Sequence, residues 1–348
     1  MDRVIAIGGS AGSIDAIKTL CESLPADIPA AICIVVHVGA RGQNLLAGIF
    51  GKKCSLPIVT AVDGQKLEDG HIYVAAADHH LIVSDDTIRL GRGPRENLAR
   101  PAIDPLLRSV GLSYGSHAIG VVLTGMLNDG ASGLADLKRC GGVTIVQNPV
   151  EAREREMPLA ALAASDVDYQ TPIAELGKLL GVLAVAPRGP SPPPPDDLRL
   201  EVEIALGRPV GSGDTARIAH PVALSCPACG GVLSQIKRAP PLRFRCQVGH
   251  AYTAETLSSE QEGSVDEAIR VALRIVEERA TLTQKMAEDA RRGGLRLSAD
   301  SYERTSVQSR RHVETLRDAL LGGERSQPGD GGEEEESEVR APVLAADM

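Results

Sequence analysis

The feature of this chain that most constrains its fold is a strand, turn and helix signal at the N-terminus. Residues 4–7 form a short apolar run, residues 8–12 read Gly-Gly-Ser-Ala-Gly, and apolar residues then recur at helical spacing from Ile14. The turn matches G-x-S-x-G, in which a serine lies on a sharp corner between a strand and a helix. Because the amide hydrogens at a helix N-terminus stabilise negative charge, Ser10 is a candidate nucleophile.

Three other interpretations of this turn were weighed. A dinucleotide fingerprint needs glycine where Ser10 and Ser13 stand, and a phosphate-binding P-loop needs a lysine that is absent. A plain glycine turn capped by a serine stays open at this point.

Residues 1–186 alternate short apolar segments with helical patterns. Strand candidates lie at 31–36, 72–76, 118–123 and 143–146, and helix candidates at 101–110, 131–139 and 173–183. Strands this apolar, separated by helices, predict an α/β fold with a doubly wound, mostly parallel sheet covered on both faces. Segments 81–83 and 88–90, joined across Asp85 and Asp86, predict an added hairpin.

The rest of the chain changes character at residue 187. Residues 187–197 form a proline-rich linker, 198–253 a small zinc-ribbon-like module, 254–321 an α-helical pair joined at Gly293 and Gly294, and 322–348 a disordered acidic tail. We expect the helical pair to contact a partner protein.

Composition excludes several classes of protein. The net charge of −9 argues against nucleic-acid binding, which depends on basic patches. Without a secretory signal or an apolar segment of membrane-spanning length, we expect no membrane insertion and a cytoplasmic location. Four cysteines occur singly in apolar surroundings, as reduced buried thiols do.

A serine nucleophile needs a base and an acid that orients the base. His37 follows the 31–36 strand candidate, and Asp129 lies in the glycine-bounded loop after the 118–123 candidate. Ligand sites in open parallel sheets form beyond the carboxyl ends of strands, where all three residues would meet. A strand-end histidine and a helix N-cap aspartate are the simpler alternatives. His71, His79, His80 and His117 are expected away from this edge.

Residues 1–186 resemble the catalytic domain of CheB-type protein-glutamate methylesterases. The matching segments are 8–12, 36–37, 69–75, 100–106, 123–126 and 128–130. The resemblance implies that Ser10, His37 and Asp129 are a catalytic triad, that Ala11 and Met126 line the oxyanion site, and that catalysis needs no cofactor. It implies glutamyl γ-methyl esters of methyl-accepting chemotaxis receptors as substrates, with glutamine deamidation as a second activity. It also implies other chemosensory signalling proteins as partners of the helical pair.

The sequence also departs from the family pattern. Ser13 and Leu127 stand where relatives often have glycine, and leucine would be strained if that position has a positive φ. The first strand begins at Arg3, so we expect no receiver domain in cis. A non-catalytic protein that binds receptors, or an esterase for another methyl ester, therefore remains an alternative.

Two further groups of residues are candidates for binding. Cys226-x-x-Cys229 and Cys246-x-x-x-His250 are two short knuckles whose separation suits structural, tetrahedral zinc, with unliganded cysteines as the alternative. This module also resembles C-terminal extensions found on some CheB-type proteins. Arg92, Arg95 and Arg100 form a basic loop, either a solvated surface or one that faces the acidic glutamyl region of a receptor helix.

Overall fold

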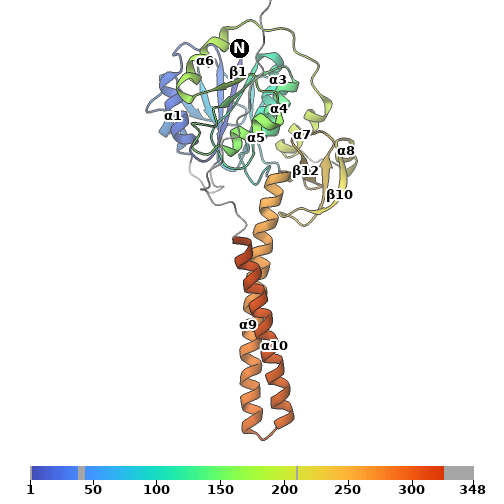
Figure 1. Ribbon diagram of the computed structural model, residues 1–348. Helices are drawn as coiled ribbons and strands as arrows, with labels where there is room; N and C mark the ends of the chain where they lie inside the picture. The colour runs from blue at the N-terminus through green and yellow to red at the C-terminus, as the bar shows by residue number, and fades with distance from the viewer. Residues whose placement is uncertain (1, 38–43, 209–210, 325–348) are drawn as a thin grey trace, which may run out of the picture. The chain divides into compact units, whose positions relative to one another are not determined.

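The structure, a computed structural model, describes residues 2–37, 44–208 and 211–324 (Figure 1). The chain divides into two compact units, of which the first ends at Gln261 and the second begins at Glu262. Among the described residues, no helix has the length and apolar character needed to cross a membrane.

The first unit is built on a seven-stranded sheet in which every pairing is parallel. Its strand order is β3-β4-β2-β1-β7-β8-β9. The strands are β1 Val4–Gly9, β2 Ala31–Val36, β3 Ile58–Thr60, β4 Ile72–Val74, β7 Ala118–Val122, β8 Val143–Gln147 and β9 Tyr169–Thr171. The central β1 and β2 are buried along their whole length, which explains why both read as unbroken apolar runs.

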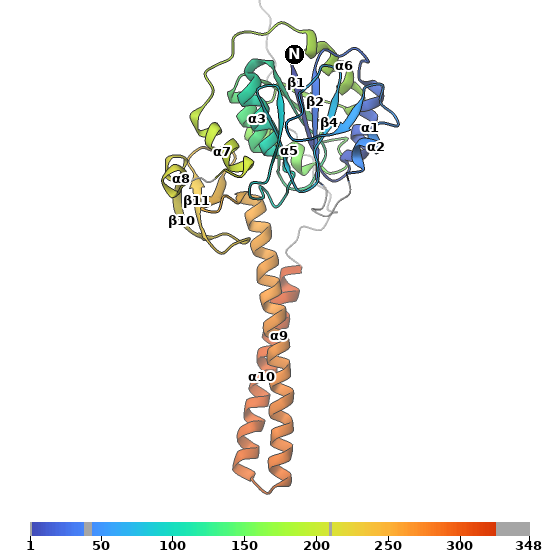
Figure 2. The ribbon, with the colours of Figure 1, turned by 180° about the vertical axis from the view of Figure 1, so that it is seen from behind.

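Helices cover both faces of this sheet, so the predicted doubly wound α/β fold is confirmed (Figure 2). One face packs against α1 Ser13–Ser23, α2 Leu46–Phe50 and α6 Ile173–Val185. The other face packs against α3 Ile103–Tyr114, α4 Ala131–Arg139 and α5 Glu156–Ala164, and the short 3-10 helix η1 Gly115–His117 precedes β7.

The added hairpin is also confirmed, as β5 His80–Ser84 pairs antiparallel with β6 Thr87–Gly91. A second, four-stranded antiparallel sheet follows in the order β10-β11-β12-β13. Its strands are β10 Ala219–Ser225, β11 Val232–Ile236, β12 Arg243–Cys246 and β13 Ala251–Thr253.

Residues 196–218 carry more helix than the sequence pattern indicated. Helix α7 Asp196–Leu206 begins inside the expected linker, and α8 Ser212–Ile218 precedes β10. Helix α7 forms because it buries one apolar stripe, Leu198, Val202 and Ala205, and places acidic residues in its first turn.

Two long helices complete the described chain. Helix α9 Ala254–Arg292 starts in the first unit, and α10 Arg296–Glu324 lies in the second. The turn between them contains Gly294 at φ 74°, a conformation that glycine adopts without strain. The predicted tail lies outside the described residues from position 325 onward.

Candidate active site

Three loops meet at the carboxyl edge of the parallel sheet. Ser10 directly follows β1, His37 directly follows β2, and Asp129 lies in the loop between β7 and α4. Because β1 lies between β2 and β7 in the sheet, these three strand ends are immediate neighbours. The fold therefore brings together residues that are far apart in the sequence.

Ser10, His37 and Asp129 form a continuous hydrogen-bonded row. His37 Nδ1 lies 3.2 Å from Ser10 Oγ, and His37 Nε2 lies 2.7 Å from Asp129 Oδ2. A proton on Nε2 donates to the carboxylate and leaves the Nδ1 lone pair facing the hydroxyl. In that tautomer the ring can accept the proton of Ser10.

The corner that holds Ser10 depends on close backbone approaches. The Ser10 amide donates to the Thr124 carbonyl at 3.0 Å, which ties the corner to the loop after β7. Gly12, at the start of α1, has φ 79°, so a side chain there would be strained. A Cβ atom on Gly125 would lie 2.0 Å from Met157 Sδ and 2.9 Å from Ser10 Cβ. Glycine is thus required at Gly12, after the serine, and at Gly125, in the loop that approaches the serine.

Ala11 directly follows Ser10, and Met126 lies in the loop after β7, which the Ser10 amide contacts at Thr124. Within the described part of the chain, neither backbone amide donates a hydrogen bond to another residue, so both are available to a ligand. The next residue, Leu127, has φ 61° and donates its amide to the Glu156 carboxylate at 2.6 Å. The positive φ considered from the sequence is present, and a leucine there is strained.

Asp129 is buried and surrounded by hydrogen-bond donors. Besides His37, its carboxylate accepts from the amides of Ile103 at 2.6 Å and Asp104 at 3.3 Å, and from Asn97 Nδ2 at 3.0 Å. Burial alone would raise the pKa of Asp129, but His37 and the N–H donors outweigh it and hold this pKa below its usual range. The first turn of α3 thus keeps the carboxylate ionised.

Sequence reasoning missed two residues of this site, Asn97 and Asp104. The side-chain Nδ2 of Asn97 donates to the carboxylates of both Asp104 and Asp129, at 3.0 Å each. Asp104 Oδ1 also accepts the amides of Gly130 at 3.0 Å and Gly133 at 2.6 Å, which fixes the loop after Asp129. Asp104 lies in the 100–106 segment, on which the family resemblance partly rests, so the sequence contained a signal for it. Asn97 lies in the basic loop, where no motif or periodic pattern marks it.

Asp104 provides a prediction about pH. Burial, and then the nearby charge of Asp129, raise the pKa of Asp104 to about 8. The folded protein therefore keeps a proton that the unfolded chain releases near pH 4. Since the folded state binds more protons in this window, the free energy of unfolding falls as pH rises from about 4 to about 8.

Asp104→Asn removes this contribution. We expect the free energy of unfolding, measured in urea, to fall between about pH 6 and pH 8.5, and to fall by about 2–3 kcal/mol less in Asp104→Asn than in wild type. Asp27→Asn, which changes an exposed aspartate, should keep the wild-type dependence. Parallel curves for wild type and Asp104→Asn would contradict the assignment.

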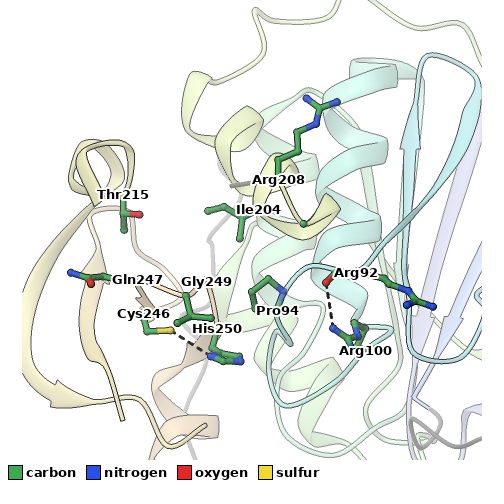
Figure 3. A pocket seen from close by; sticks show the side chains of 12 residues that line it. Arg92, Pro94, Arg100, Ile204, Arg208, Thr215, Cys246, Gln247, Gly249 and His250 are labelled. Atoms are coloured by element: carbon green, nitrogen blue, oxygen red, sulfur yellow. Dashed lines mark hydrogen bonds between the residues drawn. The ribbon is translucent and has the colours of Figure 1, made fainter. Parts of the chain in front are cut away.

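The basic loop is partly engaged within the protein. Arg100 donates to the carbonyl of Arg92 (Figure 3). It also pairs with Asp78 and donates to the carbonyl of Gly93, while Arg92 Nε donates to His79. Arg95 is exposed, and only its backbone carbonyl is used, by Ala251. Of the three arginines, only Arg100 is in an ion pair among the described residues, so the charges of the exposed Arg92 and Arg95 are free for an external partner.

A second cluster lies in the four-stranded sheet. The ligand atoms of Cys226, Cys229, Cys246 and His250 all lie within 4.8 Å of one another. Cys246 Sγ lies 3.5 Å from His250 Nδ1 (Figure 3), and Cys229 Sγ lies 3.7 Å from Cys246 Sγ. Metal–sulfur bonds of 2.3 Å in a tetrahedron separate the sulfurs by about 3.8 Å, so this group can hold a metal ion.

Comparisons with known proteins agree with this fold. Residues 5–180 match the family model described as CheB methylesterase. The crystal structure of the Thermotoga maritima CheB methylesterase catalytic domain superposes with a TM-score of 0.51 and 28% identity, over 53% of this chain and 99% of that one. The fold is therefore that of a CheB catalytic domain.

Curated relatives carry related names. A putative protein-glutamate methylesterase/protein-glutamine glutaminase of Leptospira interrogans is 38% identical over 51% of this chain and 92% of its own length. A protein-glutamate methylesterase/protein-glutamine glutaminase of Yersinia pestis is 36% identical over 48% of this chain, which spans about half (49%) of that relative. The chain belongs to the CheB methylesterase family, a family of hydrolases, as the resemblance implied.

Proposed function

We propose that this protein hydrolyses glutamyl γ-methyl esters on methyl-accepting chemotaxis receptors, with Ser10, His37 and Asp129 as its catalytic triad. The observation that carries the proposal is the row of hydrogen bonds from Ser10 Oγ through the His37 ring to Asp129. A protein that only bound receptors would not need a hydroxyl, an imidazole and an ionised carboxylate in this order.

The proposed mechanism has two halves. Ser10 Oγ attacks the ester carbonyl while His37 Nδ1 accepts the hydroxyl proton, and the amides of Ala11 and Met126 stabilise the oxyanion. The imidazolium, stabilised by Asp129, then protonates the departing methoxide, so methanol leaves and an acyl-enzyme remains. Water attacks this ester with His37 as base, which releases the glutamate carboxylate and restores Ser10.

The names of the relatives support the choice of substrate and suggest a second one. Both curated relatives are named for glutamate methylesterase and glutamine glutaminase activity. A γ-carboxamide would give the same acyl-enzyme with ammonia as leaving group. The test is methanol release from a methylated receptor fragment by the wild-type protein and its Ser10 variant. We place this reaction in the cytoplasm, where thiols such as those of Cys226 and Cys246 stay reduced.

The metal-type cluster would serve structure rather than catalysis. Cys226, Cys229, Cys246 and His250 supply a complete set of four protein ligands, which suits a structural zinc site. We expect native mass spectrometry to find about one zinc per chain and Cys229→Ser to bind zinc at least 10-fold more weakly. Cys54→Ser, which changes a cysteine outside the cluster, should keep the metal. A metal-free native protein would refute the assignment.

A further inference from the structure

The segment that follows the metal-type cluster reaches the loop that carries Asp129. Asn128, the residue before Asp129, is 4% exposed, and among the described residues its side chain hydrogen-bonds only with this segment. Asn128 Oδ1 accepts from the hydroxyls of Thr253 at 2.6 Å and Thr256 at 2.9 Å, and Nδ2 donates to Glu255 at 2.6 Å. Residues 253–256 thus satisfy the Asn128 amide.

The same segment also fixes Asn97. The backbone amide of Asn97 donates to the Ala251 carbonyl at 2.9 Å, and the side-chain Oδ1 of Asn97 accepts from the backbone amide of Thr253 at 3.0 Å. These contacts leave Asn97 Nδ2 aimed at Asp104 and Asp129. Thr253 therefore acts on Asp129 by two routes, through Asn128 along the chain and through Asn97 across a hydrogen bond.

The position of Thr253 depends on the four-stranded sheet. In the register of β12 and β13, Arg243 pairs with Thr253 and Arg245 with Ala251. The next residue of β12 is Cys246, and β13 directly follows His250, so two members of the metal-type cluster flank this strand pair. Folding of the cluster consequently sets where Thr253 lies.

A buried charge cluster attaches this sheet to the catalytic core. It balances three arginines with three carboxylates, all at most 6% exposed at the side chain: Arg108, Arg243, Arg245, Glu96, Asp136 and Glu201. Arg245 of β12 bonds Glu96 and Glu201, and Arg108 of α3 bonds the same two carboxylates. Since a buried charge that loses its partner is costly, separating the sheet from the core at this junction would be strongly unfavourable.

The loop before Asp129 needs such external support. Asn128 and Asp129 lie between two residues with left-handed backbone, Leu127 at φ 61° before them and Gly130 at φ 94° after them. Strained residues persist only where surrounding contacts over-determine them. Residues 251–256 lie beyond the 5–180 region that matches the family model, so they are an addition to the shared catalytic domain.

We propose that Thr253 is a positioning residue for the active site. Through Thr253, the metal-type module, which is the four-stranded sheet with its Cys and His cluster, holds Asn128 and Asn97 and hence Asp129 in place. This inference rests on the proposed function of Ser10, His37 and Asp129. It makes the esterase dependent on a folded metal-type module that contributes no atom to the reaction.

The test compares Thr253→Val with Thr253→Ser in the full chain. Valine keeps the shape but removes the hydroxyl, whereas serine keeps the hydroxyl. We expect Thr253→Val to lower kcat for methanol release about 10-fold with KM unchanged and zinc content retained. Thr253→Ser should stay within about 2-fold of wild type. Thr215→Val, which changes a buried threonine in α8, should also match wild type.

A spectroscopic readout separates positioning from activity. The N–H of a histidine that donates to a carboxylate gives a strongly low-field proton resonance, assigned here by its loss in His37→Gln. We expect it to move or broaden in Thr253→Val and to stay in Thr253→Ser. If wild type releases no methanol but this resonance responds to Thr253→Val, the proposed function fails and the positioning role stands.

Glu255→Ala provides a second variant in case Thr253→Val does not fold. Glu255 is exposed, so its removal leaves the core intact, while Asn128 Nδ2 loses its partner. We expect kcat to fall about 3-fold with unchanged KM and thermal stability, and Glu255→Gln, which keeps an acceptor oxygen, to restore it. Wild-type kcat and an unchanged His37 resonance in Thr253→Val, or in Glu255→Ala if that is the variant that folds, would overturn the proposal.

Discussion

Ser10→Ala should abolish methanol release from a methylated receptor fragment, with a fall in kcat on the order of 10⁵-fold or more. The Ser10 hydroxyl forms the acyl bond in the proposed mechanism, and among the described residues it is the one hydroxyl that contacts His37 Nδ1. The two amides of Ala11 and Met126 would remain, so a small residual rate from oxyanion stabilisation is expected. Methanol is measured by gas chromatography under single-turnover and steady-state conditions.

The variant should fold normally. Among the described residues, the Ser10 hydroxyl hydrogen-bonds only with His37, and the backbone bond from Ser10 to Thr124 does not need the hydroxyl. We therefore expect thermal unfolding to match wild type within error. Ser55→Ala, which alters an exposed serine outside the site, should keep full activity. Substantial methanol release by Ser10→Ala would end the proposal that Ser10 is the nucleophile.

The parallel sheet was predictable because its strands are apolar throughout. The central strands β1 and β2 have no exposed face, so their residues carry no polar alternation that could suggest another fold. The position of Ser10 and His37 at one edge of the sheet was predictable for a related reason. Each residue directly follows such a strand, and the carboxyl ends of neighbouring parallel strands share one edge. The short strands β3 and β9, at the two edges of the sheet, lack this signal.

The contacts that surround Asp129 could not be predicted. Asn97 is separated from Asp129 by 32 positions and reaches it from a loop with no periodic pattern. Thr253 is separated from Asn128 by 125 positions and lies beyond a proline-rich segment that indicated an independent module. Polar side chains in loops acquire partners only when the fold is complete, and sequence spacing alone does not encode them.

Asp129→Asn should lower kcat by about 10⁴-fold while KM changes little. The reason is the arrangement of donors around the carboxylate. One oxygen faces His37 Nε2 and the Ile103 amide, and the other faces Asn97 Nδ2 and the Asp104 amide. An asparagine must turn its NH₂ group toward one of these pairs.

The pair that contains His37 is the one that can adapt. Toward Asn97 and Asp104 the NH₂ group would meet two fixed donors, whereas His37 can shift its own proton from Nε2 to Nδ1. This shift of the proton lets His37 Nε2 accept from the new NH₂ group. The Ile103 amide, however, loses its acceptor, which lowers the free energy of unfolding by about 1–3 kcal/mol. The Nδ1–H group then points at Ser10 Oγ and cannot accept its proton.

The tautomer explanation is distinct from a simple loss of structure. Nitrogen-15 spectra of the His37 ring should show the proton on Nε2 in wild type and on Nδ1 in Asp129→Asn, with substrate binding retained. Asp15→Asn, on the exposed side of α1, should change neither the spectrum nor kcat. If Asp129→Asn keeps the proton on Nε2 and retains most of its activity, Asp129 does not orient the base, and the ionised carboxylate at the N-terminus of α3 serves the fold alone.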